Sequence, residues 1–375
     1  MSAGIVIAAG GTAGHVYPGL AVADALRRAR PGVEIRFVGT PRGIEREAVP
    51  AAGYPIDLIE VVPWARSLGA KRFTAPASLV AAAANARGLL KRLAPAAVVG
   101  MGGYASLPAV LAARSRGIPA VLHEQNAIPG IANVIGARTA RRIGVTFPET
   151  RDAFPSRIEV RVVGNPLREQ FASFDRASLR AEALAAFELE AARRTVLVTG
   201  GSLGAARLNE AAVGLAERWR DRSTLQLLVS AGREQGRSIR ERLAAFAGAI
   251  LVRCVDYIDR IELAYAAADA AVCRAGAATV MELAAVAVPA VLVPYPYARS
   301  NHQEANARAL ERFGGARVVL DDQATAATVG AEIEAMLDRP GTLGAMAGAA
   351  AAFAKPRAAD DLAAWVLAVA DRSAR

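Results

Sequence analysis

The acidic residue best placed to bind a ligand in this 375-residue chain is Glu282. It lies in the stretch 273–307, which reads as a buried strand, a glycine turn, a helix from 277 to 286, a second strand from 290 to 293, and a proline-rich loop before another helix. Ligands of α/β sheets bind at the carboxyl ends of strands, where the free N–H groups of a helix start suit a phosphate. A carboxylate on such a helix can accept both hydroxyl groups of a ribose. The stretch therefore predicts a nucleotide site, although Thr279 and Glu282 also fit a capping box, which needs no ligand.

Histidine is the second residue type that points to chemistry. The chain contains three histidines, His15, His123 and His302, and each lies in a loop that follows an expected strand. A zinc site built from all three is disfavoured, because their spacing lacks the short-range pairs typical of zinc ligands. The sequence therefore predicts no metal site, and it contains no Asp-x-Asp motif that could hold a diphosphate-bound cation.

These loops need parallel strands to position them, and two segments repeat the same order of strand, Gly-Gly turn and helix. The turns begin at Gly10 and at Gly200, 190 residues apart. We therefore expect two Rossmann-like domains in tandem, each beginning with its own phosphate-type turn. An NAD-dependent dehydrogenase is disfavoured because neither turn has the G-x-G-x-x-G order, and because the strand 33–38 ends in Gly39 and Thr40 where a ribose-binding acid would be expected.

Three further loops follow expected strands between the two glycine turns. They are MGGYASLPAVLAA after the strand 96–100, HEQNAIPGIAN after 120–122, and GNPLR after 160–163. The proline in GNPLR and the break after it make Gly164 and Asn165 the expected hinge between domains. We therefore place the first domain at residues 1–164, joined by a returning C-terminal helix at 355–375, and the second domain at 165–354.

Composition indicates a folded, soluble protein. Hydrophobic residues make up 53% of the chain and charged residues 21%, which excludes a disordered polypeptide. The two cysteines, Cys254 and Cys273, cannot form a disulfide framework, and this favours a reducing compartment. The N-terminal apolar run lacks a basic region and ends in a glycine turn, so we interpret it as a strand and not as a signal peptide. The uncharged segment 93–113 is long enough to span a membrane, but prolines and glycines interrupt it.

Six motifs occur in order along most of the chain: GGTAGHVYPGLAVA, GMGGYASLPAVLAA, HEQNAIPG, GNPLR, GGSLGA and CRAGAATVMELAAVAVPAVLVPYP. Together they resemble the MurG family, the bacterial N-acetylglucosaminyltransferases of peptidoglycan synthesis. The resemblance implies an α/β fold of GT-B architecture, in which two Rossmann-like domains with parallel sheets face a cleft. It also implies inverting transfer of N-acetylglucosamine from UDP-GlcNAc to the C4 hydroxyl of the muramoyl sugar of lipid I, forming lipid II. The alternative is another UDP-sugar enzyme of the GT-B fold, such as a UDP-GlcNAc 2-epimerase.

The resemblance also implies which residues bind the substrates. The expected UDP-GlcNAc contacts are Thr12, Ala13, Gly14, Asn126, Arg168, Ser202, Ile258, Ala277, Ala278, Thr279, Val280, Met281, Glu282 and Gln303. The expected contacts to the acceptor diphosphate are Gly10, Gly11, Gly102, Gly103 and Tyr104. Within the first set, Ser202 and Arg168 would pair with phosphates, and Glu282 would hold the ribose diol. No cofactor is expected, because helix N-termini and Arg168 can stabilise UDP as it leaves.

An inverting displacement needs one base to take the proton of the attacking hydroxyl. His15 is the first candidate and Glu124 the second, while His15 could also serve only as a hydrogen-bond donor at a helix start. Two residues depart from the family pattern: Ala13 stands where glycine is common, and His302 stands where relatives can carry glutamine. Glycine would leave the backbone of the first turn freer than Ala13 does.

The net charge of +10 points to an anionic partner. Residues 61–123 contain no acidic side chain, and the basic residues there are Arg66, Lys71, Arg72, Arg87, Lys91, Arg92, Arg114 and Arg116. Such a run suits an anionic membrane surface, at about 1 kcal/mol per basic residue near the lipid. Nucleic acid is disfavoured as a partner, because the seven tyrosines form no RNP-like motif and no recognition-helix pattern is present.

The same run contains an amphipathic helix. Its apolar residues share one helical face, which we expect to pack in the core; they are Leu79, Ala83, Ala86, Leu90 and Leu93. A lipid-linked acceptor such as undecaprenyl-linked lipid I would require docking at the membrane. We therefore expect a peripheral protein on the cytoplasmic face of the cell inner membrane, with the following membrane contacts: Phe73, Leu79, Arg87, Lys91 and Arg92.

Overall fold

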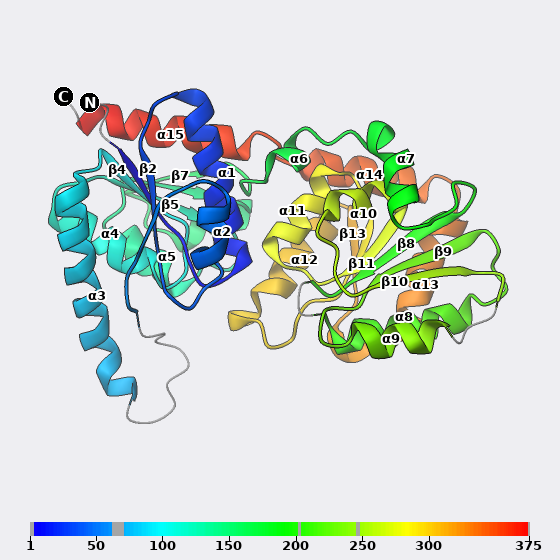
Figure 1. Ribbon diagram of the computed structural model, residues 1–375. Coiled ribbons are helices and arrows are strands. Elements are labelled where there is room, and N and C mark those ends of the chain that lie inside the picture. The colour runs from blue at the N-terminus through cyan, green and yellow to red at the C-terminus, as the bar shows by residue number, and fades with distance from the viewer. Residues whose placement is uncertain (1–3, 62–70, 202–203, 245–247, 374–375) are drawn as a thin grey trace. The chain divides into compact units, whose positions relative to one another are not determined.

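The computed structural model describes residues 4–61, 71–201, 204–244 and 248–373, apart from the side chains of residues 71–77 and 373. The chain divides into two compact units (Figure 1). Unit 1 comprises residues 1–169 and 355–375, and unit 2 comprises residues 170–354. Each unit is built on a parallel β-sheet, which confirms the predicted α/β fold with two Rossmann-like domains. The short helix α6 (Glu169–Ala172) contains the boundary between the units.

In the described part of unit 1 the sheet has seven strands. In spatial order they are β3 (Ile56–Leu58), β2 (Ile35–Gly39), β1 (Ile5–Ala8), β4 (Ala97–Gly100), β5 (Ala120–Glu124), β6 (Arg142–Val145) and β7 (Glu159–Val162). The helices are α1 (Ala13–Ala29), α2 (Glu45–Ala51), α3 (Lys71–Leu93), α4 (Ser106–Ser115), α5 (Ile131–Ala137), the 3₁₀ helix η2 (Pro148–Ala153) and α15 (Ala358–Ser373). Neighbouring strands pair in parallel, so the loops after β1, β4 and β5 lie at one edge of the sheet.

Both faces of the unit 1 sheet are buried. Successive residues of a strand point to opposite faces, and here Ile5 and Ile7 pack with α1 and α15 while Val6 and Ala8 pack with α3 and α4. Burial on both faces explains why β1 is a continuous apolar run and not an alternating one. The C-terminal helix α15 joins the first of these cores and is also tied to α1 by an ion pair between Arg28 and Asp360 at 2.9 Å.

Helix α3 buries a slightly different face from the one the sequence predicts. Its fully buried residues are Ala82, Ala86, Leu89 and Leu90. The predicted stripe is confirmed at Ala86 and Leu90, whereas Leu79 and Ala83 are only partly buried. Val80 is 70% exposed. The C-terminal half of α3 therefore packs on the sheet, while the residues near Val80 also face solvent.

In the described part of unit 2 the sheet has six strands. In spatial order they are β10 (Leu251–Val255), β9 (Leu225–Ser230), β8 (Arg194–Thr199), β11 (Ala270–Cys273), β12 (Ala290–Leu292) and β13 (Ala316–Val318). The helices are α7 (Arg176–Ala186), α8 (Ala206–Arg218), α9 (Gly236–Ala244), α10 (Ile261–Ala267), α11 (Ala277–Ala285), α12 (His302–Arg312), α13 (Ala326–Asp338) and α14 (Thr342–Phe353), with 3₁₀ turns η3 (Arg299–Asn301) and η4 (Asp321–Gln323).

The core of unit 2 is built in the same way as that of unit 1. Val196 and Val198 of the central strand β8 pack with residues of α8 and α13, including Trp219 just after α8. The loops after β8, β11, β12 and β13 lie at the carboxyl edge of the sheet, as expected for parallel pairing. Across the described ranges of both units, no helix combines the length and the apolar composition needed to cross a membrane.

Candidate active site

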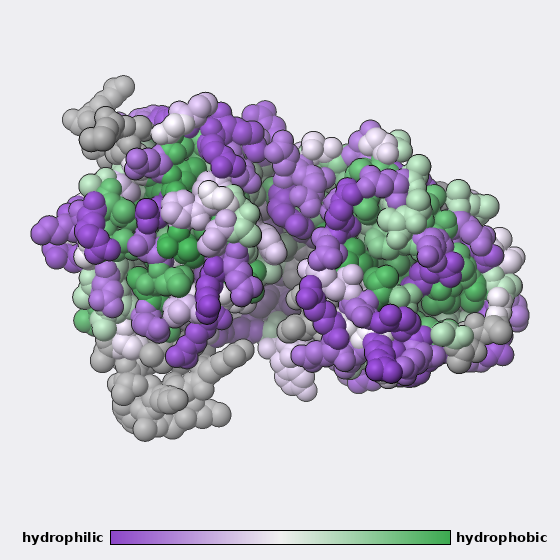
Figure 2. All heavy atoms as spheres, viewed as in Figure 1, coloured by the Kyte–Doolittle hydropathy of each residue, from purple (hydrophilic) through white to green (hydrophobic). Residues whose placement is uncertain are grey.

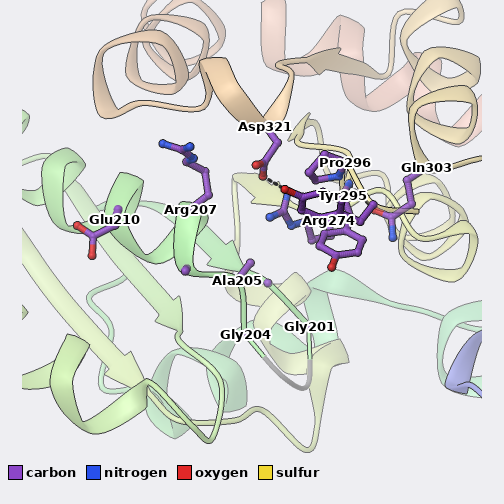
Figure 3. A pocket seen from close by; sticks show the side chains of 13 residues that line it. Gly201, Gly204, Ala205, Arg207, Glu210, Arg274, Tyr295, Pro296, Gln303 and Asp321 are labelled. Atoms are coloured by element: carbon purple, nitrogen blue, oxygen red, sulfur yellow. Dashed lines mark hydrogen bonds and ion pairs between the residues drawn. The ribbon is translucent and has the colours of Figure 1, made fainter. Parts of the chain in front are cut away.

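Unit 2 contains a cavity of about 690 Å³ at the carboxyl edge of its sheet (Figure 3). Its lining residues come from the segments that follow β8, β11, β12 and β13; they are Gly200, Gly201, Gly204, Ala205, Ala206, Arg207, Glu210, Arg274, Tyr295, Pro296, Tyr297, Gln303 and Asp321. This is the edge at which α/β sheets bind ligands. One wall is the glycine turn that opens α8, the second phosphate-type turn identified in the sequence.

Arg274 joins the loops on the other side of the cavity. Its guanidinium donates to Asp321 Oδ1 at 2.6 Å and to two backbone carbonyls of the loop after β12, both at 3.2 Å. Figure 3 shows this pair next to Tyr295, with Arg207 and Gln303 on opposite sides of it. The backbone N–H of Tyr295 donates to Gln303 Oε1 at 2.9 Å. Sequence reasoning identified Gln303 but missed Arg274 and Asp321, which follow separate strands and share no local motif.

The geometry of α11 excludes one of the two interpretations of Glu282. The helix begins at Ala277 with Gly276 as its N-cap, and no side chain caps it. Thr279 is therefore inside the helix, and the capping-box interpretation is wrong. Glu282 lies farther along the helix, half-buried, and its Oε2 accepts a hydrogen bond from the Tyr265 hydroxyl at 3.3 Å. Burial, and then the nearby charge of Glu282, raises the pKa of the Cys273 thiol to about 12, so this thiol stays neutral.

The other predicted donor contacts of unit 2 differ in what they can offer a ligand. Val280 and Met281 are buried with Ala277, whereas Ala278 and Thr279 are partly exposed. Ile258 is 6% exposed, so its side chain offers little surface to a ligand. Glu282 and Ile258 are not among the residues that line the 690 Å³ cavity. Ser202 lies outside the described residues.

In unit 1 the first candidate base, His15, lies against the glycine turn that follows β4. His15 is the third residue of α1, and its Nδ1 lies 3.0 Å from Thr12 Oγ1. A Cβ added to Gly102 would come 2.9 Å from His15 Cδ2, so the imidazole packs directly on this glycine. Gly102 has φ +83°, a conformation that L side chains rarely adopt. Glycine is thus required at position 102 for both space and conformation.

The two glycine turns of unit 1 touch each other. A Cβ added to Gly103, at φ +79°, would lie 2.1 Å from the carbonyl oxygen of Gly10. The ring of Tyr104 lies beside Gly11, since a Cβ there would be 3.8 Å from Tyr104 Cδ2. The structure therefore brings together all five residues that the resemblance assigns to the acceptor diphosphate, along with His15.

The second candidate base, Glu124, is occupied by its own loop. It is 2% exposed, and its Oε1 accepts from the backbone N–H of Asn126 at 2.9 Å. Its Oε2 accepts from the backbone N–H of Gly130 at 2.9 Å and from Asn133 Nδ2 at 2.8 Å. Both carboxylate oxygens thus hold the HEQNAIPG segment in shape. No motif in the sequence points to the part played by Asn133.

His123 has a structural environment. It is fully buried, and burial lowers its pKa to about 4, so the ring is neutral near pH 7. Its Nε2–H donates to the carbonyl of Gly164 at 2.8 Å, and its Nδ1 accepts from Gln125 Nε2 at 3.1 Å. Gln125 Nε2 also donates to the carbonyl of Met101 at 2.9 Å. This buried chain connects the loop after β5 to the glycine turn after β4.

The remaining predicted residues of unit 1 lie at or near the same sheet edge or on α3. The guanidinium of Arg168 lies 5.1 Å from the centre of the Tyr17 ring. Thr12 and Ala13 are exposed at the start of α1, with Gly14 partly exposed. Arg87, Lys91 and Arg92 are exposed along α3, and the side chain of Phe73 is outside the described set. Figure 2 shows hydrophobic patches among hydrophilic side chains on the visible face of unit 1.

Comparisons with known proteins cover both units. Residues 5–145 match the glycosyltransferase family 28 N-terminal domain, and residues 195–362 match the glycosyltransferase family 28 C-terminal domain. The chain is 47% identical, over 95% of each sequence, to a UDP-N-acetylglucosamine–N-acetylmuramyl-(pentapeptide) pyrophosphoryl-undecaprenol N-acetylglucosamine transferase of Nocardioides sp..

Solved structures show the same relationship. The crystal structure of Acinetobacter baumannii MurG matches with a TM-score of 0.78 at 30% identity, covering 97% of this chain and 99% of that one. A UDP-GlcNAc 2-epimerase from Neisseria meningitidis, bound to UDP-GlcNAc, matches with a TM-score of 0.67 at 11% identity, covering 97% and 99%. The second similarity is one of fold alone.

Proposed function

The chain belongs to glycosyltransferase family 28, and we infer that it transfers N-acetylglucosamine from UDP-GlcNAc to lipid I, forming lipid II. It is a hexosyltransferase with a nucleotide-sugar donor and a lipid-linked acceptor. The observation that carries this conclusion is that the similarity to a transferase of this specificity extends along both units. The epimerase alternative has only the shared fold in its favour.

We propose that unit 2 binds the donor. The start of α8 and the start of α11 both lie at the carboxyl edge of the sheet, where their N–H groups suit the diphosphate. Glu282 would accept the two ribose hydroxyls, and its partial exposure on α11 supports this role. Gln303, at the cavity wall, would contact the sugar, and Ser202 would bind a phosphate.

We propose that unit 1 binds the acceptor through its two touching glycine turns, with His15 as the general base. His15 would take the proton of the C4 hydroxyl as its oxygen attacks C1 of N-acetylglucosamine, and UDP would leave from the opposite face with inversion. Glu124 is disfavoured as the base, because both of its carboxylate oxygens already accept hydrogen bonds from its own loop. Arg168 would pair with the phosphates and stabilise the charge of the leaving UDP.

We further propose that α3 docks unit 1 on the cytoplasmic face of an anionic membrane, which makes the enzyme peripheral. Arg87, Lys91 and Arg92 are exposed on this helix, and Val80, earlier on the same helix, is 70% exposed. Basic residues near such a surface contribute about 1 kcal/mol each. No nucleic acid is expected as a partner.

A product assay tests the reaction. The purified protein is incubated with radiolabelled UDP-GlcNAc and a short-chain lipid I analogue, and the products are separated. We expect label in a lipid II analogue only when the acceptor is present. Label in free UDP-ManNAc without acceptor would support a 2-epimerase and contradict the transferase.

A further inference from the structure

Glu45 is a buried acid with no part in the mechanism described above. It is the first residue of α2, and its side chain is completely buried. Its Oε1 accepts from the backbone N–H of Thr40 at 2.8 Å and from the Thr40 hydroxyl at 2.7 Å. Its Oε2 accepts from the backbone N–H of Gly11 at 2.9 Å. Glu45 thus ties the loop after β2 to the first glycine turn after β1.

Three glycines leave the space that this side chain fills. A Cβ added to Gly10, Gly39 or Gly43 would come within 2.6, 2.5 and 1.9 Å, respectively, of a side-chain atom of Glu45. Separations under 3.0 Å are essentially never seen for real Cβ atoms, so a larger residue at any of the three would displace the acid. The backbone on both sides of Glu45 is therefore shaped around its carboxylate.

The peptide that joins Gly10 and Gly11 is held at both ends. Its N–H binds Glu45, and its carbonyl oxygen packs against Gly103. A peptide unit is planar, so contacts at its N–H and at its carbonyl oxygen restrict the orientation of the whole plane. Gly11 has φ +91°, and the next residues start α1, which carries His15. The orientation of this one peptide thus sets the direction in which the helix start and His15 point.

Charge alone does not explain a carboxylate at this place. A negative group close to a diphosphate site repels the ligand, so the benefit has to come from geometry. We propose that Glu45 is a positioning residue for the acceptor: it orients the first glycine turn so that the N–H groups at the start of α1 face the acceptor diphosphate and His15 faces the acceptor hydroxyl. This inference rests on the proposed role of unit 1 in binding lipid I.

The test compares Glu45→Gln with Val49→Ala in the full-length protein. Glutamine keeps the shape, but whichever way its amide lies, the nitrogen faces one of the two backbone N–H donors, that of Gly11 or that of Thr40, so the tie between the two loops is lost. Val49 is buried in the hydrophobic core one turn along the same helix, and its truncation serves as a matched control for destabilisation. We expect Glu45→Gln to lower kcat/KM for a short-chain lipid I analogue by roughly 10- to 100-fold, a typical cost of misplacement. KM for UDP-GlcNAc should not change, and Val49→Ala should lower Tm while both KM values stay the same.

Glu45→Asp is a second variant, because it keeps the charge but withdraws the carboxylate from Gly11. It should also lose acceptor kcat/KM, and it keeps the test decisive if Glu45→Gln does not fold. A fall in acceptor KM in Glu45→Gln would mean that the residue contributes only repulsion, and this would overturn the proposal. Equal acceptor kinetics in wild type and the folded Glu45 variants would overturn it as well. A wild-type protein that transfers no N-acetylglucosamine would contradict the proposed function instead.

Discussion

The glycine turn after β1 in unit 1 and the glycine turn after β8 in unit 2 share one sequence pattern, but side chains of different chemistry hold them in place. In unit 1 the N–H of Gly11 is bound by the buried carboxylate of Glu45 at 2.9 Å. In unit 2 the N–H of the corresponding glycine, Gly201, donates instead to a neutral hydroxyl, Thr199 Oγ1, at 3.3 Å. We propose that both turns face a diphosphate, and a carboxylate repels phosphate, so the charged partner of the unit 1 turn opposes ligand binding in a way that a neutral hydroxyl does not.

The surroundings of these two turns also differ. The unit 2 turn forms a wall of a 690 Å³ cavity, whereas the unit 1 turn is packed against a second glycine turn and carries His15. A strand–Gly-Gly–helix motif therefore identifies a phosphate-type loop but does not assign its task. The task depends on the side chains that other strands bring to the turn.

The largest effect is expected at His15, since a general base typically contributes roughly 10²–10⁴-fold. His15→Ala should lower kcat on this scale and leave KM for UDP-GlcNAc nearly unchanged. The acidic limb of the pH–rate profile, where the imidazole becomes protonated, should disappear, while His302→Ala in unit 2 should retain it. A raised KM for lipid I, with the acidic limb of the pH–rate profile still present, would indicate that Glu124 is the base. It would also weaken the proposal that unit 1 supplies the base while unit 2 binds the donor.

A smaller effect is expected at Glu282, and it concerns the binding of the other substrate, UDP-GlcNAc. Hydrogen bonds to a charged group are worth about 1.5–3 kcal/mol, so Glu282→Ala should raise KM for UDP-GlcNAc by roughly 10- to 100-fold. KM for the acceptor should stay the same. Tyr265→Phe removes only the hydroxyl that donates to Glu282 and is the matched control, with a minor effect on KM. An unchanged donor KM in Glu282→Ala would leave the ribose without its proposed partner.

The smallest effect on chemistry is expected on α3. Changing Arg87, Lys91 and Arg92 to Glu should release the protein from vesicles that contain anionic lipid, at about 1 kcal/mol for each basic residue lost. Turnover of a short-chain soluble acceptor should be retained, because these side chains are exposed. Vesicle sedimentation and the soluble assay are measured side by side. Loss of soluble turnover would show that α3 supports the fold or the active site.

Much of this organisation could be predicted from local sequence. Continuous apolar runs such as β1 and β8 predicted buried parallel strands, and Gly10 and Gly200 marked the turns at their ends. The capping-box interpretation of Thr279 failed because α11 starts at Ala277 with a glycine cap, which a local motif does not reveal. Glu45 was missed for a different reason. It lies 34 residues from the Gly11 N–H that it binds, so only the pairing of β1 with β2 brings the two together.

The most direct test of the division between the turns is a matched pair of glycine variants. In Gly103→Ala a Cβ would lie 2.1 Å from the Gly10 carbonyl oxygen, and in Gly204→Ala it would lie 2.3 Å from the Ala231 carbonyl oxygen, each at a positive φ. Such strain costs about 1–2 kcal/mol or more, which corresponds to roughly tenfold in binding. Measuring both KM values in each variant should give a rise for lipid I alone in Gly103→Ala and for UDP-GlcNAc alone in Gly204→Ala. A rise in the same KM for both variants would contradict the assignment of one substrate to each turn.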